Sequence, residues 1–582
     1  MSASRGSSKN GNEKSWSRDW ILFVLFVAVA VVLAVRLVFI QVVKASDYAE
    51  MADTSHTNSV SITAKRGTIY DRNGEVLASN VDCTTIYTDP QQVDDAEGVA
   101  ETLVDVLGEE YDETYSDYLE LVTKDNSFTY IQRKVDQDLA EKLEDALDEK
   151  GLEGVYYLDD TKRVYPYDEV GSQIVGNVDV DGNGIAGLEL EYDDLVGGQD
   201  GEMVVEQGQG GIPISDGSVE IDAAVDGEDV VTSVDIKLQE KVEESLLGAI
   251  EEYDAAGGDA IVLDASTGEI YAACSYAEDT EDDGVTGTGE YSLEVGKLAS
   301  ITDAYEPGST FKAFTAASIL ANKGAKLTST FSVPDSIDVY DATIEDSHEH
   351  GTETMTFTQI IAESSNVGTV LASRTVDDED LFATYAMFGF GEEEETDFPG
   401  VASGQLDAVS DWDPVRAANV TFGQGVTVTN AQLARGFAAI EQGGVAYTPH
   451  FLTSVPNDEE KDEEYAEKYA ESVEVADEKV CAKVEKMLEA VVTEGTGSAA
   501  SVEGFTVAGK TGTAQIAEEG EYLEEYNVTF AGWLSGSSSD LVCVVTVSEP
   551  DGDVYGGSVC GPVFADIMSF AAERYQVNPD AD

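Results

Sequence analysis

One long apolar segment, Trp20–Val43, constrains the architecture of this chain more than any other feature. Arg36 and Gln41 interrupt it, and about 20 such residues suffice for a helix to cross a bilayer. Basic residues precede the segment and acidic residues soon follow it. The positive-inside rule therefore predicts residues 1–19 as a cytoplasmic tail, residues 20–43 as a single membrane span and the remainder outside the cell membrane. A cleaved signal peptide is the alternative, but the run is long for one and no clear cleavage site follows it.

The composition limits the class of protein further. A chain of 582 residues is too long for one hydrophobic core, so two or more folded units are expected. With 32 Lys and Arg against 116 Asp and Glu, the net charge of −84 argues against nucleic acid as a partner, since such partners need a basic surface. The acidity is spread along the chain, and we interpret it as a solvated surface suited to high salt. Five cysteines without C-x-x-C spacing are read as small buried hydrophobes and not as zinc ligands.

A serine and a lysine three residues apart, Ser309 and Lys312, are the first candidates for chemistry. Pro307-Gly308 precedes them, and an apolar run follows, which predicts a buried helix that begins at the serine. Residues i and i+3 share a helix face, so the lysine amine can reach the serine hydroxyl. A serine becomes a nucleophile only beside a base, and a lysine serves as that base only if its pKa falls from about 10.4. Lysines usually occupy solvated faces, so this pair alone is ambiguous.

Two further segments complete a set. Ser364-Ser365-Asn366 follows an apolar helical stretch, and Lys510-Thr511-Gly512-Thr513 lies on an expected strand. S-x-x-K, S-x-N and K-T-G in this order, with about 55 and about 145 residues between them, are typical of penicillin-binding proteins and class A β-lactamases.

With these motifs the chain resembles class B penicillin-binding proteins, the peptidoglycan transpeptidases, over nearly its whole length. Six further segments are similar to family segments: Arg66–Gly74, Arg163–Pro166, Gly184–Glu189, Tyr305–Gly308, Asp346–Gly351 and Phe422–Gly425. The resemblance implies a membrane-anchored α+β protein. An N-terminal pedestal domain, of the dimerisation type, would precede a serine β-lactamase-like transpeptidase domain with an antiparallel sheet flanked by helices.

The local patterns agree with an α+β arrangement. Asp235 is expected to cap a helix with apolar residues at helical spacing, and two strands joined through Ser266-Thr267-Gly268 should form a hairpin. Three later strands and a closing helix are expected at Thr506–Thr513, Val528–Trp533, Leu541–Ser548 and Val563–Tyr575. The acidic stretch Asn457–Glu478 reads as a surface insertion. We expect the pedestal at 44–228, the transpeptidase domain at 229–577 and a tail at 578–582.

The resemblance implies roles for the motif residues. The catalytic set would be Ser309, Lys312, Ser364 and Lys510, and the substrate-binding set Asn366, Thr511, Gly512 and Thr513. The serine nucleophile would attack a stem peptide that ends in D-Ala-D-Ala, and Lys312 would take its proton, with Lys510 as the second candidate base. Each lysine would lower the pKa of the other by like-charge repulsion. Ser364 would relay a proton, the threonines would hold the terminal carboxylate, and Gly512 would let the substrate backbone approach. β-Lactams would acylate Ser309; neither a metal nor a cofactor is expected.

Several motifs also have a purely structural interpretation, which we weigh beside the functional one. His348 and His350 could bind zinc, but no third ligand is evident, and a structural or site-wall role is favoured. Phe422–Gly425 is expected to form a tight turn beside the cleft, since no lysine follows at phosphate-loop spacing. Arg66, Asp71 and Arg72 are expected to make structural ion pairs at the domain junction.

Other functions remain open at this point. A D,D-carboxypeptidase or β-lactamase would hydrolyse the acyl-enzyme, and a penicillin sensor or scaffold would not turn over. The expected partners are the peptidoglycan stem peptide, β-lactams, the cytoplasmic membrane, a glycan-polymerising membrane protein and other division or elongation proteins, but no nucleic acid. The motifs do not separate septal division from side-wall elongation, although division is slightly favoured.

Overall fold

The structure is a computed structural model that describes residues 18–44, 57–206, 219–280, 287–293, 297–518, 521–552 and 555–579. Most of the expected tails, 1–17 and 580–582, lie outside these residues. The chain divides into two compact units: Met1–Thr63 with Asp200–Val225, and Ala64–Gln199 with Asp226–Asp582.

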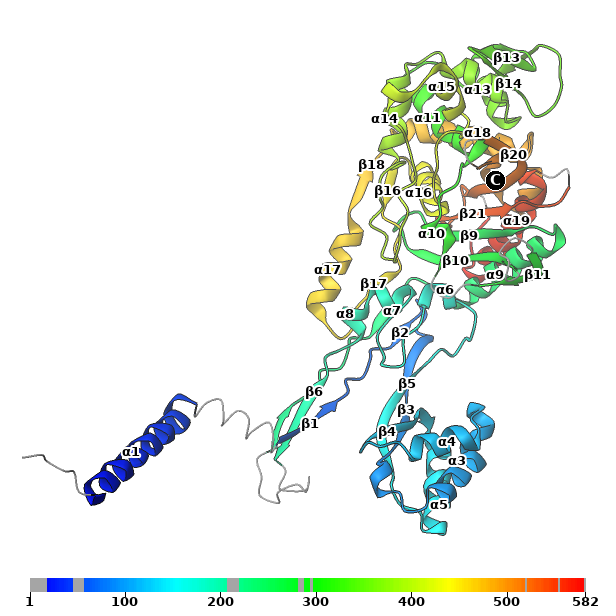
Figure 1. Cartoon of the computed structure of the whole chain (residues 1–582). Coiled ribbons are helices and arrows are strands. Elements are labelled where there is room, and N and C mark those ends of the chain that lie inside the picture. The colour runs from blue at the N-terminus through cyan, green and yellow to red at the C-terminus, as the bar shows by residue number, and fades with distance from the viewer. Residues whose placement is uncertain are drawn as a thin grey trace, which may run out of the picture. The chain divides into compact units, whose positions relative to one another are not determined.

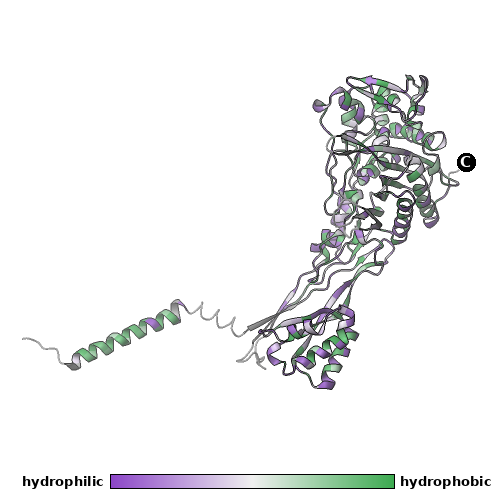
Figure 2. Cartoon of the chain, turned by 45° about the vertical axis from the view of Figure 1, so that its right-hand side comes forward, coloured by the Kyte–Doolittle hydropathy of each residue, from purple (hydrophilic) through white to green (hydrophobic). Residues whose placement is uncertain are grey.

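The first unit contains the apolar helix. α1 spans Arg18–Val38 and continues as a π-helical turn, η1, at Phe39–Val43. Its stretch from Trp20 to Gln41 is long and apolar enough to cross a membrane, and Figure 2 shows hydrophobic residues along nearly all of it. The same unit has an antiparallel sheet with the strand order β1-β6-β7, formed by β1 (Thr57–Ile62), β6 (Gly201–Glu206) and β7 (Val219–Asp222).

The second unit begins with a small layered module. β3 (Val76–Thr88) pairs antiparallel with β4 (Thr129–Asp136) and β5 (Val155–Val164). Helices α3 (Ala96–Tyr111), α4 (Tyr115–Val122) and α5 (Gln137–Lys150) lie beside this sheet in Figure 1, and they share one apolar core with it. On each helix, apolar residues recur at helical spacing on the face turned toward the strands. This spacing places Leu103 of α3 and Leu143 of α5 in the shared core.

Three of the family-like segments meet at one buried carboxylate. Arg66 Nε and Arg163 Nε lie 2.6 Å from opposite oxygens of Glu189, whose side chain has no exposed area, and Arg66 also pairs with Asp193. Arg72 pairs with Glu269 and stacks on the ring of Tyr271. The expected ion pairs of the two arginines are thus present.

The expectation for Asp71 was wrong. Its carboxylate accepts hydrogen bonds from the backbone N–H groups of Asn73, Glu75 and Ile236, and it pairs with no cation among the described residues. It therefore stabilises a turn, as short acidic side chains commonly do.

One mixed sheet joins segments from both expected domains. Its strand order is β17-β8-β2-β3-β4, with β2 (Ile69–Tyr70) parallel to β8 (Val230–Thr232) and β17 (Leu452–Ser454) antiparallel to β8.

The large antiparallel sheet of the second unit has six strands in the order β11-β10-β9-β21-β20-β19. They are β9 (Gly257–Asp264), β10 (Ile270–Thr280), β11 (Gly287–Ser292), β19 (Thr506–Glu518), β20 (Glu521–Ser535) and β21 (Leu541–Ser548). β9 and β10 form the expected hairpin, whereas β19 and β20 are longer than expected because they pair with each other beyond their apolar stretches.

Helices cover both faces of this sheet. α9 (Ile236–Glu252) and α19 (Gly556–Arg574) pack on one face, while α11 (Lys312–Ala321), α16 (Asn430–Glu441) and α18 (Glu478–Thr493) pack on the other. Successive residues of β9 and β21 alternate between the two cores, as strand geometry requires. The Asp235 carboxylate caps α9 as expected, accepting from the N–H groups of Lys237 and Leu238. The observed architecture is the expected α+β arrangement.

Three element boundaries differ from expectation. Ser309 lies in a 3-10 turn, η3 (Gly308–Phe311), and the α-helix proper begins at Lys312. The closing helix begins at Gly556, ahead of Pro562, because the bare Gly556 backbone packs directly on β19 and β20. The stretch expected to be a surface insertion forms α17 (Glu459–Ala470) and β18 (Ser472–Glu474), which pairs with β16 (Val445–Tyr447).

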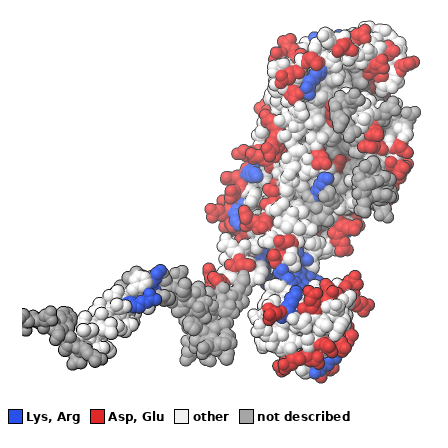
Figure 3. Space-filling model, in the orientation of Figure 1, with Lys and Arg blue, Asp and Glu red and all other residues white. Residues whose placement is uncertain are grey.

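The remaining elements are short and connect these layers. They are η2 (Pro90–Gln92), α6 (Ser172–Val175), α7 (Gly187–Glu191), α8 (Asp193–Val196), α10 (Ala299–Thr302), β12 (Thr330–Val333), β13 (Ser336–Val339), β14 (Ala342–Glu345), β15 (Glu353–Thr356), α12 (Phe357–Ala362), α13 (Asn366–Ser373), α14 (Asp378–Met387), η4 (Val409–Asp411), α15 (Pro414–Val420) and η5 (Ser498–Ala500). Figure 3 shows that acidic side chains far outnumber basic ones on the face in view, in keeping with the net charge.

Candidate active site

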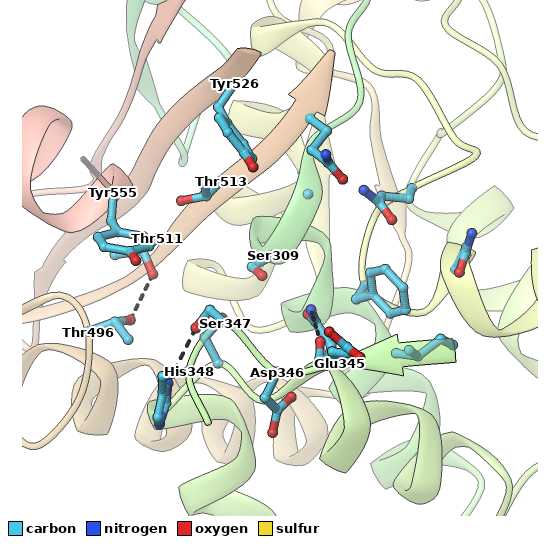
Figure 4. A pocket seen from close by; sticks show the side chains of 18 of the residues that line it. Ser309, Glu345, Asp346, Ser347, His348, Thr496, Thr511, Thr513, Tyr526 and Tyr555 are labelled. Carbon is cyan, nitrogen blue, oxygen red and sulfur yellow. Dashed lines mark hydrogen bonds between the residues drawn. The ribbon is translucent and has the colours of Figure 1, made fainter. Parts of the chain in front are cut away.

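A cleft of about 1010 Å³ collects side chains from all three motif segments. Ser309, Ser364, Asn366, Thr511 and Thr513 all line it. In Figure 4 Ser309 lies between the strand that carries Thr511 and Thr513 and the loop that follows β14. Segments about 200 residues apart in sequence therefore form one site.

The turn that carries Ser309 is held from behind by a second turn. Gly308 N–H donates to Gly423 O, and a Cβ at Gly423 would lie only 2.1 Å from Gly308 O. Gly423 and Gly425 have φ of +85° and +72°, which glycine adopts without strain. Glu306 accepts a hydrogen bond of 2.7 Å from Gly425 N–H. Phe422–Gly425 is thus the expected tight turn, and its close approach to Gly308 explains its glycines.

Two buried lysines converge on one hydroxyl. Lys312 Nζ lies 3.3 Å and Lys510 Nζ 2.9 Å from Ser364 Oγ, and both lysines are fully buried. Lys312 also donates to Ser364 O at 2.5 Å and to Asn366 Oδ1 at 2.7 Å. Within the described parts of the chain, Ser309 Oγ makes no hydrogen bond, so the expected contact from Lys312 is directed to Ser364 instead.

Burial changes the protonation of both amines. Removal from water lowers the pKa of Lys312 to about 7, against the opposing pull of the Asp346 carboxylate. Burial also lowers the pKa of Lys510 well below its usual value, and repulsion from Lys312 adds to this. Desolvation is therefore the main cause for both amines, and of the expected mutual repulsion only the effect of Lys312 on Lys510 is found. A lysine with a pKa near 7 is neutral often enough at physiological pH to accept a proton.

Asp346 holds the S-x-N segment from the opposite wall. Its Oδ2 accepts from Ser365 Oγ at 2.7 Å and lies 3.0 Å from His350 Nε2, while Oδ1 accepts from Val367 N–H at 3.0 Å. The side chain is only 3% exposed. These bonds hold Ser365 and Val367, which closely follow Ser364, and Ser364 itself has φ +61°, a left-handed conformation that is costly for a serine. The sequence showed the D-S-H-E-H-G segment but not this role for its first residue.

The two histidines near the cleft have separate roles. His350 bonds Asp346, which raises the pKa of the imidazole, and His348 contacts Ser347 in the cleft wall. Among the residues that the structure describes, no group of three or more His, Cys, Asp or Glu side chains is placed to hold a metal. The contacts with Asp346 and Ser347 agree with the favoured structural and site-wall role of the two histidines.

The K-T-G strand forms the remaining wall. Thr511 Oγ1 lies 2.7 Å from Thr496 Oγ1, and both residues line the cleft (Figure 4). Thr496 was missed in the sequence because it lies in an irregular segment before the strand, with no motif around it. Gly512 does not line the cleft. A Cβ there would lie 3.0 Å from Pro307 O, so the nucleophile turn packs closely on this glycine, and the expected approach of a substrate backbone stays a prediction.

Comparison with known proteins agrees with this geometry. The model of the penicillin-binding protein transpeptidase domain matches residues 258–569, and that of the penicillin-binding protein dimerisation domain matches residues 61–232. Stage V sporulation protein D of Bacillus subtilis is 31% identical over 97% of this chain and 86% of its own length. Peptidoglycan D,D-transpeptidase FtsI of Escherichia coli is 29% identical over 98% of this chain and 94% of its own. A peptidoglycan synthetase structure from Bifidobacterium adolescentis superposes with a TM-score of 0.70 at 26% identity, covering 90% of this chain and 98% of that one.

The fold and the cleft define a protein with a penicillin-binding transpeptidase domain behind an N-terminal dimerisation-type domain. Together with the relatives, they show that the chain belongs to the class B penicillin-binding proteins, as its motifs indicated. The expected family and fold class are confirmed.

Proposed function

We propose that this protein is a peptidoglycan D,D-transpeptidase that acts through an acyl-enzyme on Ser309. Ser309 Oγ attacks the carbonyl of the penultimate D-alanine of a stem peptide and forms an ester, and the terminal D-alanine leaves with a proton on its amine. The amine of a second stem peptide then attacks the ester, which forms the cross-link and frees Ser309. Relatives that carry the name peptidoglycan D,D-transpeptidase support this reaction class.

The observation that carries the proposal is the pair of buried lysines on Ser364 Oγ beside an open cleft that holds Ser309. Such an arrangement suits proton transfer, since Lys312 can take the Ser309 proton when neutral and Ser364 can pass a proton to the leaving amine. Asn366 is suited to orient the substrate amide. Thr511 and Thr513 offer hydroxyl groups to the terminal carboxylate, with Gly512 keeping the strand close to the nucleophile turn.

Transfer is better supported than hydrolysis of the β-lactamase type. A class A β-lactamase uses a positioned glutamate to activate the water that hydrolyses the acyl-enzyme. Among the described residues that line the cleft, the carboxylates are Glu345 and Asp346. Asp346 already accepts three hydrogen bonds through both of its oxygens, and Glu345 is exposed.

The chain's organisation follows the same proposal. Residues 20–43 anchor it in the cytoplasmic membrane, residues 1–19 are cytoplasmic, the pedestal occupies 44–228, the catalytic domain occupies 229–577 and a tail follows at 578–582. α1, with the length and polarity of a membrane span, supports the anchor. The outer surface of the membrane is where peptidoglycan and β-lactams meet the enzyme, and a glycan-polymerising membrane protein would supply the strands to be cross-linked.

The test uses the full chain in detergent with a fluorescent penicillin and with nascent peptidoglycan. The wild type should be labelled covalently and should form cross-linked dimers of stem peptides, whereas Ser309→Ala should do neither. Labelling that persists in Ser309→Ala would place the nucleophile elsewhere. Labelling by the wild type with only release of D-alanine and no cross-links would favour a carboxypeptidase. A fluorescent fusion in dividing cells then separates division, with septal bands, from side-wall elongation.

A further inference from the structure

A second cavity of about 350 Å³ lies in the same unit and shares no lining residue with the catalytic cleft. It opens between the end of α14, the loop that follows it, and strand β18. Its lining contains five carboxylates: Glu392, Glu393, Glu394, Glu395 and Glu474. Such a cluster could be only a solvated acidic surface, so its meaning depends on how these side chains are held.

Glu394 differs from its neighbours because it is buried without a hydrogen bond. Its side chain is only 6% exposed, yet neither carboxylate oxygen has a hydrogen-bond donor among the described residues. Arg435 Nε lies 3.7 Å away, but that guanidinium donates to the carbonyl oxygens of Tyr447 and Phe388. Burial accordingly raises the pKa of Glu394 to about 7, against the pull of Arg435. Buried carboxyl groups are normally hydrogen-bonded, so this one lacks a donor.

The rest of the lining indicates what kind of donor fits. Met387 and Val473 are 53% and 55% exposed at the cavity, and Pro449, which is largely buried, also lines it. A methylene chain can lie along such side chains while a charged head reaches a carboxylate. Where the structure describes the chain, no three carboxylate, histidine or cysteine side chains converge as metal ligands, which favours an organic cation over a metal ion.

We propose that this cavity binds an alkylammonium group, with the ammonium on Glu394 and its methylene chain against Met387 and Val473. The remaining glutamates attract the cation to the entrance, because fields of one sign raise the local concentration of the opposite charge. Two sources share this chemistry: a free aliphatic amine, and a lysine side chain of a polypeptide.

The test is calorimetric titration of the full chain in detergent at low ionic strength. The probes are 1,5-diaminopentane for the free amine, N-acetyl-lysine N-methylamide for the polypeptide, and the latter with its side-chain amine acetylated as the uncharged control. We expect saturable one-to-one binding of a charged probe and none of the acetylated one. The tighter of the two charged probes identifies the source.

Variants make the result specific. Glu394→Gln should weaken binding at least about tenfold, which corresponds to about 1.4 kcal/mol, without lowering the melting temperature or penicillin acylation. Glu474→Gln at the rim should weaken it less. Glu379→Gln, an exposed control on α14 outside the cavity, should leave it unchanged. The proposal would be overturned if no saturable binding were found, or if Glu394→Gln and Glu379→Gln weakened binding equally. Either outcome would mean that only the diffuse negative charge of the surface attracts the probe.

Discussion

Replacement of Asp346 by Asn tests whether the S-x-N segment must be held for catalysis. Asp346 Oδ2 takes part in two of the three hydrogen bonds to this side chain, those with Ser365 and His350. Asp346 Oδ1 accepts the third, from Val367 N–H. An asparagine keeps one acceptor oxygen, and when that oxygen stays on Val367 N–H, both bonds on Oδ2 lose their acceptor. Hydrogen bonds to a charged group contribute about 1.5 kcal/mol or more each, which puts the loss near 3 kcal/mol. This matters because Ser364 sits at φ +61°, a conformation that costs about 1–3 kcal/mol.

If the whole loss destabilises the position of Ser364 that is needed for catalysis, acylation should slow about hundredfold, since 1.36 kcal/mol is a factor of ten in rate. The assay is the stopped-flow rate of labelling by a fluorescent penicillin across pH. Asp346 also raises the pKa of Lys312, so removing its charge should move the midpoint of the pH–rate profile to lower pH while the plateau falls. A general loss of folding would not move the midpoint in this way.

Asp341→Asn is the matched control, because Asp341 is exposed on the turn between β13 and β14 in the same wall. It should retain the wild-type rate and midpoint. His350→Ala removes one of the bonds to Asp346 and should produce a smaller decrease than Asp346→Asn. A wild-type plateau rate in Asp346→Asn would refute the reasoning, because it would show that Ser364 keeps its position without these bonds.

Three further outcomes follow from the same structure. Acylation of the wild type should fall about tenfold per pH unit below about 7, because Lys312, with a pKa near 7, must be neutral to accept a proton; a profile flat from about pH 5 to 9 would contradict this. Glu189→Ala leaves Arg66 and Arg163 without their shared buried carboxylate, so the free energy of unfolding measured in urea should fall by about 3–5 kcal/mol, and a loss below about 1 kcal/mol would count against it. The net charge of −84 should make the melting temperature rise between low and molar salt as repulsion is screened; scanning calorimetry that shows no rise would reject the high-salt reading.

Much of the catalytic unit was predictable because its signals are local. Asp235 precedes a helix whose apolar residues repeat at helical spacing, and its carboxylate makes the expected cap. The hairpin of β9 and β10 follows from two apolar runs around a Ser-Thr-Gly turn. The three motifs could be grouped because their residue types and order suit one kind of chemistry, although no local pattern says that they meet in space.

The contacts that position the site could not be predicted in the same way. Glu189 joins Arg66 and Arg163 across separations of 123 and 26 residues, and Asp346 reaches Ser365 across 19. In a chain with 116 acidic residues, the local sequence does not indicate which carboxylates are buried and paired. The close contact between Gly512 and Pro307 O could not be predicted either, because Pro307 lies in a turn that is distant in the sequence.

The geometry of Lys312 connects its protonation to its role. Ser364 O and Asn366 Oδ1, at 2.5 and 2.7 Å, are oxygens that can only accept, so each takes one N–H of the amine. A neutral amine has two N–H donors and one lone pair, and these two bonds therefore use both donors and leave the lone pair toward the hydroxyl groups of the cleft. A protonated amine carries a third N–H, and Ser364 Oγ, 3.3 Å from Lys312 Nζ, can accept it. The S-x-N segment therefore orients Lys312 in both protonation states, while burial favours the neutral form that can receive the proton of Ser309.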